Sequence, residues 1–376
     1  MVTGPPEDLL AWLRGGEPVT RRTDFTVGSA MPDGRLDLCK QALGPYGMRL
    51  VADALPEGGP VRHLLLGTDG LGDDGAETAA AGATASGAST LYLGCNTITA
   101  AGACRITDRL IASPGIVRGL WLKRNPLGPD GGRIVGEAVR TGLTTIDLVQ
   151  TGLDAPGAAA LVDHLLASGG AGRLFVGGNP LGPEGARELA RLIDADGVEE
   201  LYVSAAGIGD EGAAILADAL RSGRPRGLRR LSVASNGIDR TSAAKLVAAA
   251  AAAGVETLDL GRVRAAGYLG AADNRLGDTG AAHIARTLGE TPHRLAHLDL
   301  THTGITSRGA LHLLDGARRA TSPTRLILGG GMASRVKREL NHLAAAVPLL
   351  APHPDVAAIR SVHRAGKGHA PDQEGG

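Results

Sequence analysis

The segment LLLGTDGLGDDG at residues 64–75 carries a pattern that recurs along this chain. Aliphatic residues alternate at its start, and a polar position, an aliphatic residue and a glycine follow at fixed spacing. LYLGCNTITAAG at 91–102 and LWLKRNPLGPDG at 120–131 keep the same frame. Internal repetition at a period of about 20–50 residues is typical of a stacked solenoid, so the sequence predicts one.

The polar position of the repeat serves as a marker of its register. It is occupied in turn by Gln41, Asp69, Asn96, Asn125, Thr151, Asn179, Ala206, Asn236, Asn274, Thr303 and Gly331. Successive markers lie 26 to 30 residues apart, except for a gap of 38 residues between Asn236 and Asn274. We therefore count about eleven repeats, one of which is split.

Each repeat predicts one strand and one helix. The alternating half has period two, as in a short strand with one buried face. The half after the glycine, for example GARELARLIDA at 185–195, has apolar residues at helical spacing. Strands in a parallel sheet lie about 4.8 Å apart, whereas packed helices need about 8–10 Å. The stack must curve, and the predicted α/β fold is a right-handed horseshoe with a parallel inner sheet and outer helices.

The repeated motif resembles that of leucine-rich repeat proteins, specifically the helix-bearing ribonuclease-inhibitor-like subtype. The resemblance covers roughly residues 33–347. It implies that the asparagines at the marker position bond to the backbone of neighbouring turns and have a structural role. The family also includes GTPase-activating proteins for a small GTPase, and bacterial effectors.

Composition limits the classes of partner. The chain has 39 basic and 39 acidic residues, whereas nucleic acids and anionic membranes select a basic excess. Three cysteines without paired spacing indicate reduced thiols and a cytoplasmic protein. The N-terminus lacks the pattern of a signal peptide, and the longest apolar run is too short to span a bilayer. High alanine, glycine and arginine content favours a bacterial origin.

The outward position between the two strand aliphatics is predicted to line the concave face. Four of the eight aromatic residues of the chain stand in this row: Tyr92, Trp121, Phe175 and Tyr202. Such rings are favoured interface anchors, and neighbouring glycines (Gly94, Gly177 and Gly178) should leave room for a partner. The alternative is that the rings only pack against one another across strands.

The later part of the same row is acidic. Asp259 and Asp299 occupy equivalent positions in adjacent repeats and should be close neighbours, with His297 and His302 beside Asp299. Two adjacent carboxylates can share a proton, bind a cation or receive an arginine. We expect them to pair with nearby arginines (Arg230, Arg262, Arg325) or with a bound protein. An enzyme or metal site at these residues is the alternative, although their spacing matches no known signature.

The split repeat contains an insertion at 261–273, GRVRAAGYLGAAD, in the loop that leaves a strand. Insertions in solenoids map to loops on one face, often the binding face. Arg262 and Tyr268 supply charge and apolar reach to this predicted rim loop. The alternative is a surface insertion without a role.

These features divide the chain into three parts. Residues 1–32 form an N-terminal cap with a helix at 7–14, residues 33–347 the solenoid, and residues 348–376 a mostly disordered tail with one possible helix at 355–364. The basic segment 334–347 is predicted to be the last solenoid helix.

We expect a cytoplasmic protein-binding scaffold without catalytic activity, metal or cofactor. Its partner-binding residues would be Tyr92, Trp121, Phe175, Tyr202, Asp259, Asp299, Arg262 and Tyr268. The alternatives are a GTPase-activating regulator and the enzyme or metal site named above. The partner's identity and the oligomeric state are not predicted.

Overall fold

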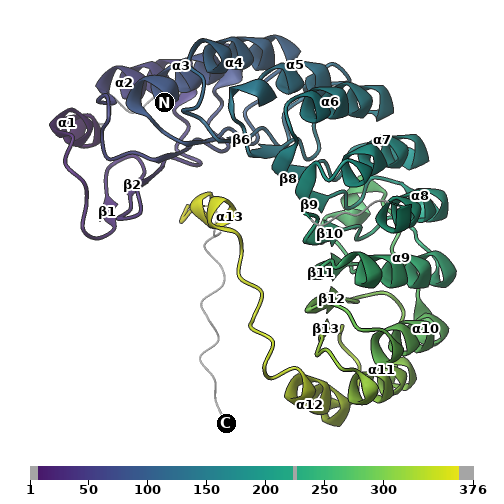
Figure 1. Ribbon diagram of the computed structural model, residues 1–376. Helices are drawn as coiled ribbons and strands as arrows, with labels where there is room; N and C mark the ends of the chain where they lie inside the picture. The colour runs from purple at the N-terminus through teal and green to yellow at the C-terminus, as the bar shows by residue number, and fades with distance from the viewer. Residues whose placement is uncertain (1–6, 223–226, 364–376) are drawn as a thin grey trace. The chain divides into compact units, whose positions relative to one another are not determined.

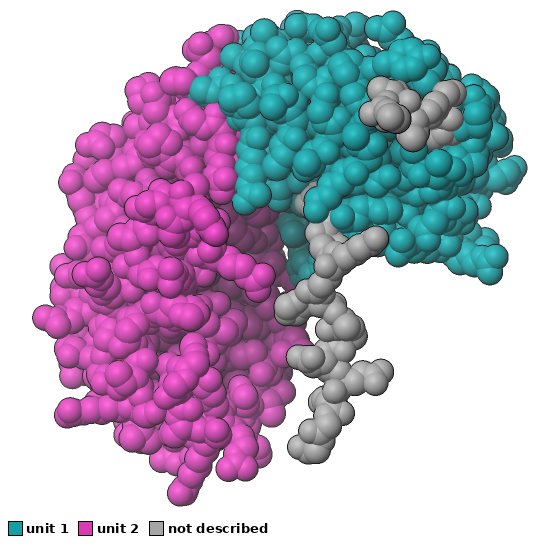
Figure 2. All heavy atoms as spheres, turned by 180° about the vertical axis from the view of Figure 1, so that it is seen from behind, with its two compact units in different colours: residues 1–128, 137–147, 352–376 teal, residues 129–136, 148–351 magenta. Residues whose placement is uncertain are grey.

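A computed structural model describes residues 7–222 and 227–363 of the chain. Over these residues, strands alternate with helices, and the 13 strands follow chain order in a mostly parallel sheet. The α/β class predicted from the repeats is therefore confirmed. The chain divides into two compact units, shown separately in Figure 2: unit 1 comprises residues 1–128, 137–147 and 352–376, and unit 2 residues 129–136 and 148–351.

Unit 1 begins with a cap and continues with parallel strands. Its strands are β1 (Thr23–Asp24), β2 (Ser29–Ala30), β3 (Arg35–Asp37), β4 (His63–Leu65), β5 (Thr90–Tyr92), β6 (Gly119–Trp121) and β7 (Thr145–Asp147). Its helices are α1 (Glu7–Gly15), α2 (Gly44–Ala54), α3 (Gly72–Ser86), α4 (Ala100–Ala112), the 3-10 helix η1 (Val139–Thr141) and α13 (Pro354–Ala358). Helix α5 (Gly131–Glu137) crosses the boundary between the units.

Unit 2 holds the remaining elements. Its strands are β8 (Ala171–Phe175), β9 (Val198–Tyr202), β10 (Arg230–Ser232), β11 (Thr257–Asp259), β12 (His297–Asp299) and β13 (Arg325–Ile327). Its helices are α6 (Ala155–Ala167), α7 (Gly182–Asp194), α8 (Gly209–Ser222), α9 (Arg240–Ala253), η2 (Ala266–Leu269), α10 (Gly277–Glu290), α11 (Ser307–Arg319) and α12 (Ser334–Leu343). Sequential helices from α6 to α12 pack against one another.

The strand register follows the repeat. The central aliphatic residues pair with one another, for example Leu64 with Leu91 and Leu258 with Leu298, and they are fully buried. In each unit the helices that connect these strands lie on one side of the sheet (Figure 1). We call the opposite sheet surface of each unit its inner face. Residues between the aliphatic positions point toward the inner face because side chains alternate along a strand.

The asparagines at the marker position bond to neighbouring turns, as the resemblance implies. Asn96 Oδ1 accepts from Asp69 N at 2.9 Å, and Asn96 Nδ2 donates to the carbonyls of Leu66 at 2.6 Å and Leu93 at 3.0 Å. The same arrangement recurs at Asn125, Asn179, Asn236 and Asn274. Each asparagine thus satisfies buried backbone groups in its own repeat and in the preceding one, which ties the two together. We call these side chains the asparagine ladder.

The turn at the ladder needs an unusual backbone conformation. The residue before the marker has a positive φ in most repeats, including Thr68 (65°), Cys95 (61°) and Arg124 (57°). The motif glycine, six positions after the marker, is required for a different reason. A Cβ at Gly157 would lie 2.4 Å from the Pro129 carbonyl oxygen, so only glycine permits this close approach between adjacent repeats.

The two ends differ from the sequence prediction. The cap contains α1 as expected, but also a hairpin of β1 and β2 that extends the sheet in antiparallel pairing next to β3. The two strands of this hairpin are too short to produce a periodic pattern in the sequence. The last solenoid helix ends at Leu343, before Val347. The tail, expected to be mostly disordered, has a defined path over residues 348–363 with α13 at Pro354–Ala358; residues 364–376 lie outside the described part of the chain.

Asp69 occupies the ladder position in its repeat and lacks the amide that an asparagine provides there. Its Oδ1 accepts from Gln41 N at 2.8 Å, but its buried Oδ2 has no hydrogen-bond partner among the described residues. Burial raises the pKa of this carboxyl to about 7. The protonated acid therefore resembles asparagine, whereas the ionised form leaves a buried charge whose Oδ2 atom has no donor.

We predict that Asp69→Asn stabilises the protein at pH 8 by an amount on the order of 4 kcal/mol, because asparagine keeps a donor at this position and does not ionise. The native state holds the proton up to a pKa of about 7, and the unfolded state releases it near 3.8. The stability of the parent should therefore fall relative to the variant as pH rises from 3.8 to 7, and their difference should vanish at the acid end. Urea unfolding of both proteins at several pH values across this range measures the difference in their free energies of unfolding.

Asn125→Asp is the matched control, because it places the same acid in another step of the ladder. Its stability should fall with rising pH in the same way. A pH-independent difference between Asp69→Asn and the parent would contradict this account of the ladder.

Candidate functional site

The inner face of unit 1 is covered. The outward residues of its five parallel strands are buried, with exposed fractions of 0 to 2% at Asp37, Leu65, Tyr92, Trp121 and Asp147. Sequence reasoning placed Tyr92 and Trp121 on an open surface available to a partner. In the structure they are interior residues, and the segment 352–363 of the same unit bonds to this face, where Thr145 Oγ1 donates to Asp355 Oδ2 at 2.8 Å.

The glycines beside the aromatic row also differ from the expectation. A Cβ at Gly94 would lie 2.5 Å from the hydroxyl oxygen of Tyr92, so this space is filled by the protein's own ring. Gly178 is covered by Gln150 and by Leu269, whose Cδ1 would lie 3.4 Å from a Cβ there. These glycines accommodate neighbouring side chains of this chain.

The inner face of unit 2 retains partly exposed aromatic residues. Phe175 and Tyr202, from the paired strands β8 and β9, stack with ring centroids 4.3 Å apart and an angle of 7° between the planes. Tyr202 also donates its hydroxyl to Glu200 Oε2 at 2.8 Å. Burial, followed by the charge of Glu200, raises the pKa of the Tyr202 phenol well above its ordinary value, so the hydroxyl remains a donor. Cross-strand packing and a polar anchor together hold this aromatic pair in place.

The acidic pair is assembled as predicted, but its partners are different. Asp259 and Asp299 are register neighbours on β11 and β12. Asp259 accepts from Ser232 Oγ at 2.7 Å and from Gly261 N at 2.9 Å, and Asp299 accepts from Thr301 N at 2.8 Å. Burial is the main cause that raises the pKa of Asp259, and the charge of Asp299 adds to it.

The nearby arginines bind other groups. Arg230 lies 3.6 Å from Glu200, Arg262 lies 3.2 Å from Asp273, and Arg325 donates to the carbonyls of Ala344 and Val347. The expected pairing of the two aspartates with these arginines is therefore wrong. The Ser232 hydroxyl and the nearby backbone N–H groups bind the two carboxylates. The longer arginine side chains bind other acceptors.

A cavity of about 140 Å³ lies over the acidic pair. Tyr202, Ser232, Asp259, His297 and Asp299 line it, together with Leu350 from the C-terminal segment. His297 Nε2 is 2.9 Å from the carbonyl oxygen of Pro348, whereas His302 is exposed in the turn after β12. Of the four residues named for an enzyme or metal site, Asp259, His297 and Asp299 thus line one cavity, and His302 does not. No cluster of three potential metal ligands occurs in residues 7–222 and 227–363.

The insertion at 261–273 forms an ordered rim loop that folds back over earlier repeats. Val263 N donates to Ser235 Oγ at 2.9 Å, and Gly237 N donates to the Ala272 carbonyl at 2.9 Å. Leu269 reaches Gly178, in the turn that follows β8 and Phe175. The neighbouring Tyr268 is 97% exposed. The loop thus brings Tyr268 to the same edge of the sheet as the Phe175–Tyr202 pair.

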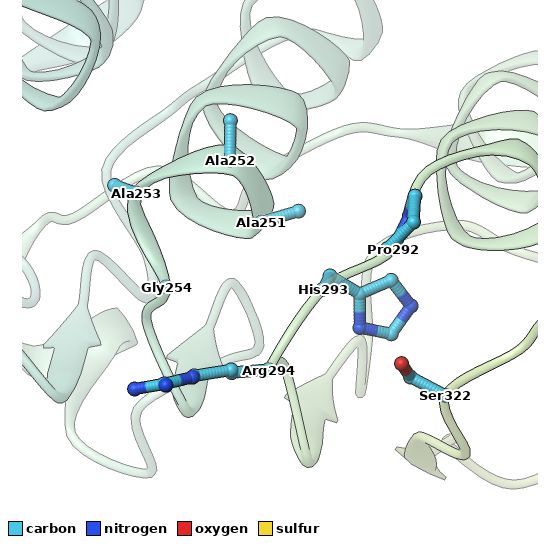
Figure 3. Close-up of a pocket in the computed structure, with 8 residues that line it drawn as sticks. All are labelled: Ala251, Ala252, Ala253, Gly254, Pro292, His293, Arg294 and Ser322. Atoms are coloured by element: carbon cyan, nitrogen blue, oxygen red, sulfur yellow. The ribbon is translucent and has the colours of Figure 1, made fainter.

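Sequence reasoning missed a second cavity, of about 570 Å³, at the opposite ends of the strands (Figure 3). The C-terminal end of α9 and the loops before β12 and β13 line it, and the His293 ring points toward Ser322. Burial lowers the pKa of His293, which keeps the imidazole neutral near pH 7. These residues lie at a helix end and in connecting loops without a shared motif, so no sequence pattern indicates them.

No family model and no curated protein sequence matches this chain. Among the described residues, no helix has both the length and the apolar character needed to cross a membrane.

We predict that Tyr202→Phe destabilises the protein by about 1.5–3 kcal/mol, because it removes a hydrogen bond to a charged group. Glu200 is 5% exposed and would lose a donor, while the stacked ring is kept. Urea unfolding gives the difference, and Tyr46→Phe, on a ring that is 64% exposed, serves as the control. Equal stability of Tyr202→Phe and the parent would show that the hydroxyl is not engaged by Glu200.

Proposed function

We propose that this chain is a non-catalytic, protein-binding leucine-rich repeat scaffold of the ribonuclease-inhibitor-like subtype. It would have about eleven repeats curved into a horseshoe and would act in the bacterial cytoplasm. The parallel sheet in chain order, the alternating helices and the asparagine ladder support this architecture. The binding surface in this proposal is on unit 2 and consists of the Phe175–Tyr202 pair, the acidic cavity and the rim loop.

The exposure of Tyr268 is the observation that carries the proposal. At 97%, its exposed fraction is the largest among the large apolar side chains of the described residues. A tyrosine offers much contact area at little cost in side-chain entropy, and such residues are enriched among binding hot spots. An exposed ring on a flexible loop would be costly to order, but this loop is already held in place by several contacts.

Those contacts come from both ends of the loop. Backbone bonds join Ser235 to Gly261 and Gly237 to Ala272, and an ion pair joins Arg262 to Asp273. The backbone around Tyr268 is therefore arranged before binding, which lowers the entropy that a complex must lose. Arg262 and Arg264 are exposed near it and supply a polar margin around the aromatic contact.

The acidic cavity would contribute orientation. Asp259 and Asp299 lie together behind a partly apolar rim that includes Ile327 and Leu350. A partner that brings a basic side chain to this region would gain electrostatic complementarity, which acts mainly on specificity and association rate.

We predict that Tyr268→Ser abolishes partner binding without altering folding, because the side chain makes little contact within the protein. The measurement is capture from native lysate by the immobilised full-length parent and variant, followed by mass spectrometry. Tyr46→Ser is the matched control, since Tyr46 is an exposed tyrosine on α2 of unit 1.

A protein retained by the parent and by Tyr46→Ser, but lost by Tyr268→Ser, would support the rim loop as a recognition element and identify the partner. Equal retention by all three proteins would remove the rim loop from the binding surface.

A further inference from the structure

The inner faces of the two units differ in coverage. In unit 1 the outward strand residues are 0 to 2% exposed, although they include two carboxylates, Asp37 and Asp147. In unit 2 the equivalent residues Phe175, Tyr202 and Asp259 are only partly buried. The same strand geometry produces both rows, so the difference comes from what lies over unit 1.

The covering element is the segment 352–363 of the same chain, which we call the C-terminal strap. Its first part bonds to β7, where Thr145 Oγ1 donates to Asp355 Oδ2 at 2.8 Å. Its last part bonds to β3, where Arg35 Nη1 donates to the Arg360 carbonyl at 2.6 Å and Val362 N donates to Asp37 Oδ2 at 2.7 Å. In Figure 1, α13 lies on the side of the sheet opposite α2, α3 and α4.

The strap has the length to cross the face directly. Between β3 and β7 there are four strand spacings, or roughly 19 Å at about 4.8 Å each. Residues 355–362 span roughly 16 Å when the residues through Ile359, whose ψ of 12° continues the helical turn, rise by about 1.5 Å and the others by about 3.3 Å, and the side chains of Thr145, Asp355 and Asp37 bridge the remainder. The strap therefore passes over β4, β5 and β6, the strands that carry Leu65, Tyr92 and Trp121. Ala358 and Ile359 are its buried apolar residues, at 8% and 6% exposure.

The strap has the properties of a bound peptide. Helix α13 has only five residues, and an isolated helix of this length is unstable in water. Two of its anchors are backbone groups, the Arg360 carbonyl and the Val362 N–H, which any peptide of suitable shape can supply. The preceding residues Leu349 and Leu350 are 79% and 45% exposed, and the chain before the strap is held through the carbonyls of Pro348 and Ala351.

We propose that the C-terminal strap is a tethered ligand of the inner face of unit 1, which it blocks until it dissociates. The face would then bind in trans a short peptide of the same chemistry: an acidic residue at the start of one helical turn, two small or aliphatic residues, and an extended stretch. Tethering gives the strap an effective concentration in the millimolar range, so it excludes weak competitors. This inference goes beyond the proposed function, because it concerns another surface and does not depend on the rim loop.

Trp121 provides a direct probe of this proposal. The chain has two tryptophans, so a Trp12→Phe background leaves Trp121 as the sole indole in the full-length protein. In this background, Ala358→Asp/Ile359→Asp places charges against the buried face and should release the strap. Emission from Trp121 should shift to longer wavelength, and acrylamide quenching should rise several-fold. Arg360→Gln is the matched control, because the Arg360 side chain is exposed and its anchor is a backbone carbonyl.

A synthetic peptide of residues 352–363, added to the released variant, should restore the protected emission in a saturable manner. The same peptide carrying Ile359→Asp should not. If Trp121 stays protected in the released variant, or if it is exposed and the peptide does not restore protection, the proposal is overturned.

Hydrogen exchange of the unmodified chain tests the proposal if the released variant fails to fold. The amide of Val362 should exchange much faster than the amides of Leu93 and Leu122, which donate to neighbouring strands. Fast exchange at Val362 supports a strap that opens locally. Exchange of Val362 at the rate of the strand amides would make the strap an integral part of the fold and contradict the proposal. Neither result bears on capture through Tyr268, so this inference and the proposed function fail separately.

Discussion

Buried backbone groups at the turn after each strand need partners, and the asparagine ladder provides them. A solenoid repeats this turn beside its neighbours, so the same donors and acceptors recur where water is excluded. One side chain such as Asn179 accepts from the turn of the preceding repeat and donates to two carbonyls. Where Thr303 replaces asparagine, its hydroxyl donates to the carbonyl of Leu300 in its own repeat, and among the described residues it makes no bond to the preceding turn. The ladder sets the alignment of adjacent strands, and this alignment places every outward residue in its row.

In the proposed function, partner binding then depends on which segments cover these rows of outward residues. The inner faces of both units are built from the same outward strand positions. The C-terminal strap occupies the inner face of unit 1. The inner face of unit 2 keeps a stacked aromatic pair and an acidic cavity partly exposed. The rim loop adds an exposed tyrosine, and its Leu269 contacts the turn that follows Phe175. Under the two proposals, the strap covers the inner face of unit 1, and the inner face of unit 2 is available to a partner.

Periodicity predicted the strands, the helices and the neighbouring positions of Asp259 and Asp299, because these depend on local spacing. It could not predict contacts between residues far apart in sequence. Asp37 and Val362 are 325 positions apart, and the tail from Pro348 onward, which contains the strap, is rich in proline, glycine and charged residues, a composition that is also typical of disorder. Periodicity also could not predict the burial of Tyr92 and Trp121, whose outward strand positions it assigned correctly. The choice of hydrogen-bond partners by Asp259 depends on side-chain reach, which strand spacing alone does not reveal.

The most direct test is hydroxyl-radical footprinting of the unmodified full-length chain, with oxidation of each aromatic residue followed by mass spectrometry. The structure predicts rapid oxidation of Tyr268 and Tyr46, which are 97% and 64% exposed, and protection of Tyr92 and Trp121, which are each 2% exposed. Oxidation of Trp121 as rapid as that of Tyr268 would mean that the inner face of unit 1 is open in solution, and it would contradict the division between a covered and an available surface.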